Sequence, residues 1–103
     1  MPISVEVQVV NPDGLHTRPA ATIAQAVAAF DARVTIANLR TGGAAQVVAG
    51  PISIMLLDAQ RGDQLAVTAE GAEAQAAIDA VSDLIRGGFG ELVVSITDGV
   101  AIG

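Results

Sequence analysis

The only histidine in the chain, His16, follows a turn-forming stretch and stands two residues before Arg18. A neutral imidazole is a nucleophile, as phosphoryl transfer requires. A guanidinium has a fixed positive charge and a fork of donors that matches phosphate oxygens. The pair therefore predicts that His16 accepts a phosphoryl group and hands it on, with Arg18 beside it.

The residues after His16 predict a helix that begins at or next to this histidine. Pro19 suits a first helical turn, and apolar residues then recur at helical spacing at Ala20, Ile23, Ala24, Val27 and Phe30. The first amides of a helix have no partner within it and favour an anion, so they would hold a phosphoryl group without a metal. The competing interpretation is that a lone histidine before a helix is a surface residue or a weak cap.

Alternating polar and apolar residues predict the strands that must position this site. Four strands are expected, with a helix after the first strand, a short helix from Pro51 to about Ala59, and a helix from about Ala72 to Arg86. The strands are expected at residues 3–9, 33–39, 46–49 and 64–69. The order β-α-β-β-α-β-α predicts an α+β fold, an open-faced β-sandwich whose four-stranded antiparallel sheet carries three helices on one face. The buried stripe of the last helix is expected at Ala74, Ala77, Ile78, Val81, Leu84 and Ile85.

Composition excludes several classes of function. The chain has 103 residues, a net charge of −6, no cysteine, and five strong cations that are all arginines scattered along the sequence. Nucleic-acid binding, which needs a basic footprint, is therefore not expected, nor are disulfides or cysteine metal sites. Neither a signal peptide nor a run long enough for membrane insertion is apparent, so we expect a cytoplasmic protein.

No motif indicates an independent enzyme. A phosphate-binding loop of the Gly-x-x-x-x-Gly-Lys kind is missing, and so is a set of residues with metal-ligand spacing. We expect no cofactor and no metal, and a phosphoryl carrier rather than an independent enzyme.

The stretch Gly14-Leu15-His16-Thr17-Arg18-Pro19-Ala20-Ala21 resembles the active-site signature of HPr, the histidine phosphocarrier of the phosphoenolpyruvate-dependent phosphotransferase system. The order of elements agrees with that family up to about Glu91. The resemblance implies that His16 carries the phosphoryl group on Nδ1, with Arg18 paired to it and the amides of Thr17 and Arg18 nearby. It also implies a monomeric domain that takes its phosphoryl group from enzyme I and passes it to a IIA-type acceptor.

The same resemblance implies that an apolar patch on the first two helices binds these partners. The residues expected to supply it are Thr17, Ala20, Ala21, Pro51, Ile52, Met55 and Leu56. For Met55 and Leu56 the competing interpretation is ordinary packing in the core. The second helix also departs from the family pattern, because a gap-free alignment puts Gly50 where many members have a regulatory serine. An alignment on Ser53 would need a longer hairpin and a shorter helix.

The two ends suggest a more specific alternative. Residues 10–14 and 87–91 resemble the HPr-type domain of the phosphotransfer subunit of dihydroxyacetone kinase, and residues 99–103 resemble the start of enzyme I. We therefore expect a phosphocarrier domain at residues 1–91 and a tail or linker at 92–103, with fusion to other phosphotransfer domains as an open alternative. A rival from another class is a ferredoxin-like ligand-binding or regulatory module without phosphotransfer.

Overall fold

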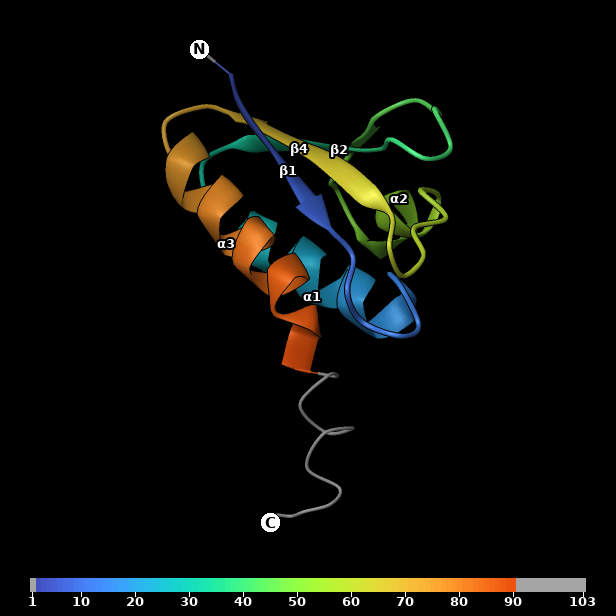
Figure 1. Cartoon of the computed structure of the whole chain (residues 1–103). Coiled ribbons are helices and arrows are strands. Elements are labelled where there is room, and N and C mark those ends of the chain that lie inside the picture. The colour runs from blue at the N-terminus through green and yellow to red at the C-terminus, as the bar shows by residue number, and fades with distance from the viewer. Residues whose placement is uncertain (1, 91–103) are drawn as a thin grey trace.

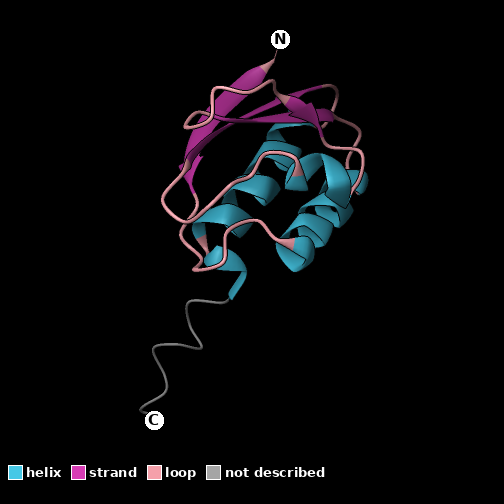
Figure 2. Ribbon diagram, turned by 90° about the vertical axis from the view of Figure 1, so that its right-hand side faces the viewer, coloured by secondary structure: helices cyan, strands magenta, loops and turns pink. Residues whose placement is uncertain are grey.

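The computed structural model describes residues 2–90, and it consists of one antiparallel sheet covered on one face by helices (Figure 2). The strand order is β1-β4-β2-β3, so the first strand lies beside the last one rather than beside its neighbour in sequence. The strands are β1 (Ile3–Gln8), β2 (Arg33–Asn38), β3 (Gln46–Val47) and β4 (Gln64–Glu70). The expected α+β fold with a four-stranded sheet and three helices is confirmed.

The register of the sheet follows from the alternation of side chains. β1 and β4 align Ile3 with Ala69 and Val7 with Leu65, while β2 and β4 align Ile36 with Val67. These pairs place apolar side chains of three strands on the same face. That face is buried beneath the helices and forms the upper wall of the core.

Three helices lie together on this face (Figure 1). They are α1 (Thr17–Ala28), α2 (Pro51–Met55) and α3 (Ala74–Arg86), followed by a single 3₁₀ turn, η1 (Gly88–Gly90), which the sequence patterns did not predict. α1 packs against both α2 and α3. The start of α1 therefore belongs to the helical layer of the molecule, in which α2 is a neighbour of α1.

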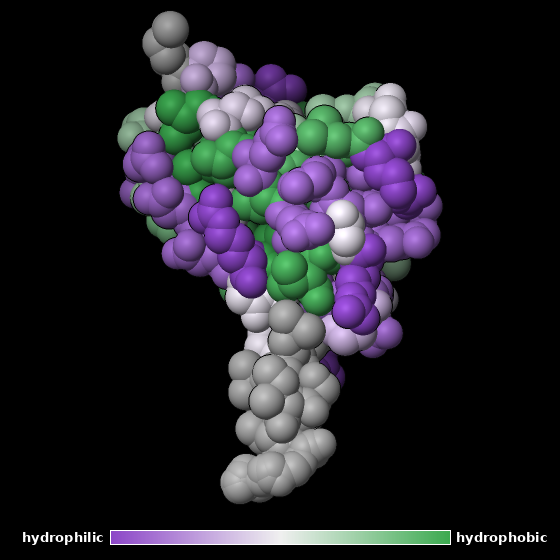
Figure 3. All heavy atoms as spheres, viewed as in Figure 1, coloured by the Kyte–Doolittle hydropathy of each residue, from purple (hydrophilic) through white to green (hydrophobic). Residues whose placement is uncertain are grey.

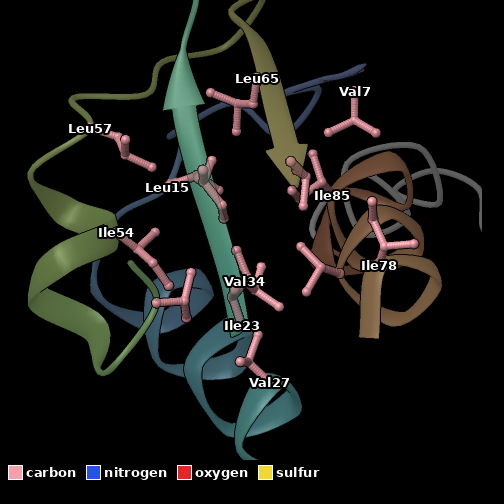
Figure 4. Close-up of a cluster of buried hydrophobic side chains, with 14 of the residues drawn as sticks. Val7, Leu15, Ile23, Val27, Val34, Ile54, Leu57, Leu65, Ile78 and Ile85 are labelled. Carbon is pink, nitrogen blue, oxygen red and sulfur yellow. The ribbon is translucent and has the colours of Figure 1, made fainter. Parts of the chain in front are cut away.

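The core is built from aliphatic side chains, as the scarcity of aromatic residues requires. Figure 4 shows Leu15, from the segment before α1, among Ile54, Leu57 and Leu65. Leu15 is 4% exposed, so it anchors that segment in the core. On the face seen in Figure 3, apolar atoms remain visible among the polar side chains.

Three element boundaries differ from the sequence predictions by two residues or more, and the buried stripe of α3 also differs. β3 ends at Val47 rather than Ala49. α2 ends at Met55 rather than near Ala59, because Leu57 and Asp58 donate to carbonyls only three residues back and Asp58 turns to a φ of +50°. α3 begins at Ala74 rather than Ala72. On α3, Ser82 is buried while Leu84 is only half-buried, so Ser82 takes a place in the buried stripe that was expected for Leu84.

Candidate functional site

His16 is the N-cap residue of α1, with an extended backbone (φ −81°, ψ −164°). Its carbonyl oxygen accepts the first hydrogen bond of the helix, from the amide of Ala20 at 3.0 Å, while its side chain makes no capping bond. The amides of Thr17 and Arg18 occupy the first two helical positions, where no acceptor exists within the helix. His16 is partly exposed, so its imidazole stands at the helix start and remains accessible.

Arg18 and Thr17 both have exposed side chains in the first turn of α1. No acidic residue occupies this turn, so nothing on the helix itself offsets its positive end. Pro19, the third helical residue, is buried and has no N–H. The first turn of α1 therefore combines the amides of Thr17 and Arg18 with an exposed arginine two residues after His16, and these are groups that suit an anion.

The segment before His16 is fixed by close contact with residues 59 and 60. Gly14 has a φ of +67°, and a Cβ atom there would overlap the carbonyl oxygen of Ala59 and lie 3.0 Å from Cα of Gln60. The amide of Leu15 donates to the same Ala59 oxygen at 3.0 Å. Buried Asn11 closes the turn, because its side-chain amide donates to the Gly14 oxygen at 2.6 Å. His16 therefore follows two residues that have little freedom to move.

α2 carries most of the expected partner surface. Ile52 is 72% exposed, Leu56 66% and Met55 44%, so the core-packing interpretation of Met55 and Leu56 is wrong. Pro51 is exposed and Ala21 is half-buried. Ala20 requires a correction, because it is 0% exposed: its position on α1 faces the core, so it cannot contact a partner.

Gly50 is the N-cap of α2, which agrees with the gap-free alignment. Ser53 lies inside the helix, where its hydroxyl donates to the Gly50 oxygen at 2.8 Å. The helix-capping position of α2 thus has no hydroxyl of its own.

A polar cluster that the sequence patterns did not predict lies next to residues 59 and 60, which contact the segment before His16. Asp63 is 6% exposed, and its carboxylate accepts from Arg40 Nε at 2.8 Å, Asn38 Nδ2 at 3.0 Å and the Gln60 amide at 2.9 Å. Burial raises the pKa of the Asp63 carboxyl, but the hydrogen bonds from Gln60, Asn38 and Arg40 outweigh it, so this pKa lies below its ordinary value. One signal could have revealed the cluster: Asn38 continues the buried alternation of Val34 and Ile36, where a polar side chain needs a partner.

Over residues 2–90, no three histidine, cysteine or acidic side chains lie close enough to hold a metal ion together. None of the helices in that part of the chain is both long and apolar enough to cross a membrane.

The fold and the histidine at the helix start define a phosphocarrier domain of the HPr class. A family model described as "PTS HPr component phosphorylation site" matches residues 3–87. The chain belongs to this family. The HPr-like phosphocarrier interpretation is thereby confirmed in preference to a ferredoxin-like module.

The relatives that are similar to this chain include a phosphocarrier that the match covers almost completely and two longer proteins that it covers only in part. Phosphocarrier protein NPr of Escherichia coli (strain K12) is 32% identical over 91 residues, which cover 88% of this chain and 99% of NPr. A multiphosphoryl transfer protein of Escherichia coli O157:H7 is 33% identical over 89 residues, 86% of this chain. The phosphoryl donor subunit DhaM of the PEP-dependent dihydroxyacetone kinase from Providencia stuartii is 34% identical over 93 residues, 90% of this chain. The chain spans only 24% of the multiphosphoryl transfer protein and 19% of DhaM.

Among solved structures, HPr from Thermoanaerobacter tengcongensis superposes with a TM-score of 0.79 and 30% sequence identity. The match covers 86% of this chain and 97% of that one.

Proposed function

We propose that His16 is the residue that accepts the phosphoryl group and passes it on. The observation that carries this proposal is the position of His16 as the N-cap of α1, directly before the amides of Thr17 and Arg18, in a chain of the HPr family. The neighbouring Gly14–Ala59 contact supports it, because it fixes the segment from which the imidazole projects.

The transfer is a displacement at phosphorus. The lone pair of an imidazole nitrogen, Nδ1 by family resemblance, attacks the phosphorus atom of the donor. The new P–N bond forms at His16 while the bond to the donor breaks, and its electron pair leaves with the donor. The amides of Thr17 and Arg18 and the Arg18 guanidinium stabilise the negative oxygens during the transfer. In passage to an acceptor, a nucleophile of the acceptor attacks the phosphorus atom, and the P–N bond breaks with its electron pair returning to the imidazole nitrogen.

Enzyme I as donor and a IIA-type domain as acceptor belong to the same proposal. Ile52 and Met55 on α2, with Leu56 at its C-cap, are exposed apolar residues, and α2 packs against α1, so they supply a contact surface for such partners. Thr17, Ala21 and Pro51 extend this surface. A monomeric carrier in the cytoplasm is the setting that the family resemblance implies.

We also propose that residues 1–91 form the carrier domain and that 92–103 are a tail or linker. The match of the family model to residues 3–87 supports this boundary. The expectations for the tail fall on residues 91–103, outside the part that the structure describes.

A second candidate is the HPr-like domain of a dihydroxyacetone kinase phosphotransfer subunit. The observation that favours it is the 34% identity to DhaM over 93 residues. In this case the final acceptor of the phosphoryl group is dihydroxyacetone rather than a sugar. Transfer from the labelled carrier to a dihydroxyacetone kinase subunit, compared with transfer to a sugar-specific IIA domain, separates the two candidates.

The central test is phosphorylation by phosphoenolpyruvate and enzyme I. We expect an acid-labile phosphohistidine on the wild-type chain and none on His16→Ala, which should fold normally because His16 is partly exposed. An ordinary HPr in a parallel reaction shows that the donor is active. A His16→Ala protein that still acquires the label would contradict the proposal.

Arg18→Ala tests the role of the guanidinium. Loss of one charged hydrogen bond to the phosphoryl group should slow transfer about tenfold, with no change in folding. Arg33→Ala is the matched control, since Arg33 is an exposed arginine on β2, away from the start of α1. Equal rates for both variants would remove Arg18 from the mechanism.

A further inference from the structure

One peptide group, between Ala59 and Gln60, is held from both sides. Its N–H, on Gln60, donates to Oδ2 of Asp63 at 2.9 Å. Its carbonyl oxygen, on Ala59, accepts from the amide of Leu15 at 3.0 Å. The C=O and N–H of a trans peptide point in opposite directions, and residues 2–90 contain no cis bond. A single planar group therefore links the Asp63 carboxylate to the residue just before His16.

The Asp63 carboxylate is itself fixed by two further donors. Arg40 Nε donates to Oδ1 at 2.8 Å, and Asn38 Nδ2 donates to Oδ2 at 3.0 Å. Asn38 Nδ2 also donates to the carbonyl of Leu57, two residues after the end of α2, at 3.0 Å. The cluster thus joins the end of β2, the end of α2 and the segment before His16.

We propose that Asp63 is a positioning residue for His16 in phosphoryl transfer. The proposal rests on the proposed function of His16. The charged carboxylate makes short hydrogen bonds and polarises the Ala59–Gln60 peptide. This strengthens the hydrogen bond that the Leu15 amide donates to the Ala59 carbonyl oxygen. The orientation of the Ala59 carbonyl then determines where Leu15 sits, and with it the start of α1.

The consequence for the reaction follows from connectivity. His16 follows Leu15 directly, and its extended backbone aims the imidazole relative to the amides of Thr17 and Arg18. A displacement of about 1 Å at a reacting group is enough to slow a reaction about 100-fold. Asp63 does not touch the phosphoryl group in this scheme, and it acts only through the peptide and Leu15.

Asp63→Asn in the full chain tests the proposal. This change keeps the shape but replaces one acceptor oxygen with an NH₂ group that opposes the existing donors. We expect kcat for acceptance from enzyme I to fall about 10- to 100-fold while KM stays within about twofold. The amide proton resonance of Leu15 should move upfield as its hydrogen bond weakens. Asp79→Asn is the matched control, because the Asp79 carboxylate bonds only to Gln75 on an exposed face of α3 among the contacts that the structure describes.

Arg40 variants keep the test decisive if Asp63→Asn does not fold. The Arg40 side chain is 47% exposed, so it can be changed with little effect on the core. Arg40→Gln should lower kcat severalfold, and Arg40→Lys, which keeps the charge, should recover part of the loss. A merely structural role would instead lower the fraction of folded protein and leave kcat per folded molecule unchanged.

Two results would overturn the proposal, and a third would show that the proposed function is wrong. A folded Asp63→Asn protein with wild-type kcat and an unmoved Leu15 resonance overturns it, as does a loss confined to KM. A wild-type chain that acquires no phosphoryl group from enzyme I shows instead that the proposed function is wrong. In that event, the Leu15 amide and His16 ring resonances still decide whether Asp63 positions the histidine, because displaced values support this role and unchanged values overturn it.

Discussion

Gly14 and Gly42 share a φ of +67°, but only Gly14 lies against another segment of the chain. Alanine at Gly42 would meet nothing within 4 Å, whereas alanine at Gly14 would overlap the Ala59 carbonyl. We expect Gly42→Ala to lower the free energy of unfolding by about 1 kcal/mol and Gly14→Ala by about 2–4 kcal/mol. Urea denaturation measures both, and the difference isolates the contact before His16. Equal losses would show that this contact is not tight.

At the residue scale, the sequence predicted the site where its residues are neighbours in the chain. His16, Thr17 and Arg18 are neighbours, so their arrangement follows once a helix begins among them. The Asp63 cluster could not be predicted in the same way, because Asn38 and Asp63 are separated by 25 residues and only the fold brings them together. Ala20 was assigned to the partner surface by family resemblance, whereas its helical spacing with Ile23 and Val27 already placed it on the buried face of α1.

α2 offers two isoleucines in one short helix, one exposed and one buried. Ile52 is 72% exposed and Ile54 is 0% exposed. If α2 binds partners, Ile52→Ala should raise KM for phosphoryl transfer about tenfold and change stability by less than about 0.5 kcal/mol. Ile54→Ala should lower the free energy of unfolding by about 2–5 kcal/mol, with little effect on KM of the folded fraction. An unchanged KM for Ile52→Ala would remove this residue from the contact surface.

The turn between α2 and β4 should make stability depend on pH through Asp63. The pKa of this carboxyl is lowered in the folded protein, so its stabilising effect is complete above the unfolded pKa of about 3.9. The effect is lost as the pH falls further, through the folded pKa. The difference in free energy of unfolding between wild type and Asp63→Asn should therefore be constant from pH 7 to about 5 and shrink below about 4. Arg40 and Asp58 are the other charged groups in contact with this cluster.

Urea denaturation at pH 7, 5 and 3 measures this difference. Asp79→Asn controls for the change in net charge. A gap between wild type and Asp63→Asn that persists unchanged at pH 3 would contradict the prediction.

Among the elements, strands were predicted more reliably than helix ends. Alternation located β1, β2 and β4 to within a residue or two because each has one buried face. The end of α2 depends instead on a contact remote in sequence, since the Asn38 side-chain amide donates a hydrogen bond to the Leu57 carbonyl oxygen. Asp58 also adopts a positive φ there. Local patterns contain no information about such contacts.

For the molecule as a whole, the boundary at residue 91 makes a simple prediction. The buried hydrophobic residues of the described part run from Val7 to Ile85 and form a single cluster. A chain of residues 1–91 should therefore unfold within about 2–4 °C of the full chain and accept a phosphoryl group at the same rate. Differential scanning calorimetry and the enzyme I assay test this. A Tm lowered by more than about 8 °C would show that residues 92–103 contribute to the fold.

The strand order has a consequence for how the protein is made. Within residues 2–90, β1 pairs with β4 alone, and Ile3 cannot pair until Ala69 has been synthesised. At a synthesis rate of about 5–20 residues per second, the ribosome needs several seconds to reach that partner. During this time β1 has no partner strand and its backbone groups are unpaired, so the nascent chain must avoid pairing this strand with other chains until β4 has been synthesised.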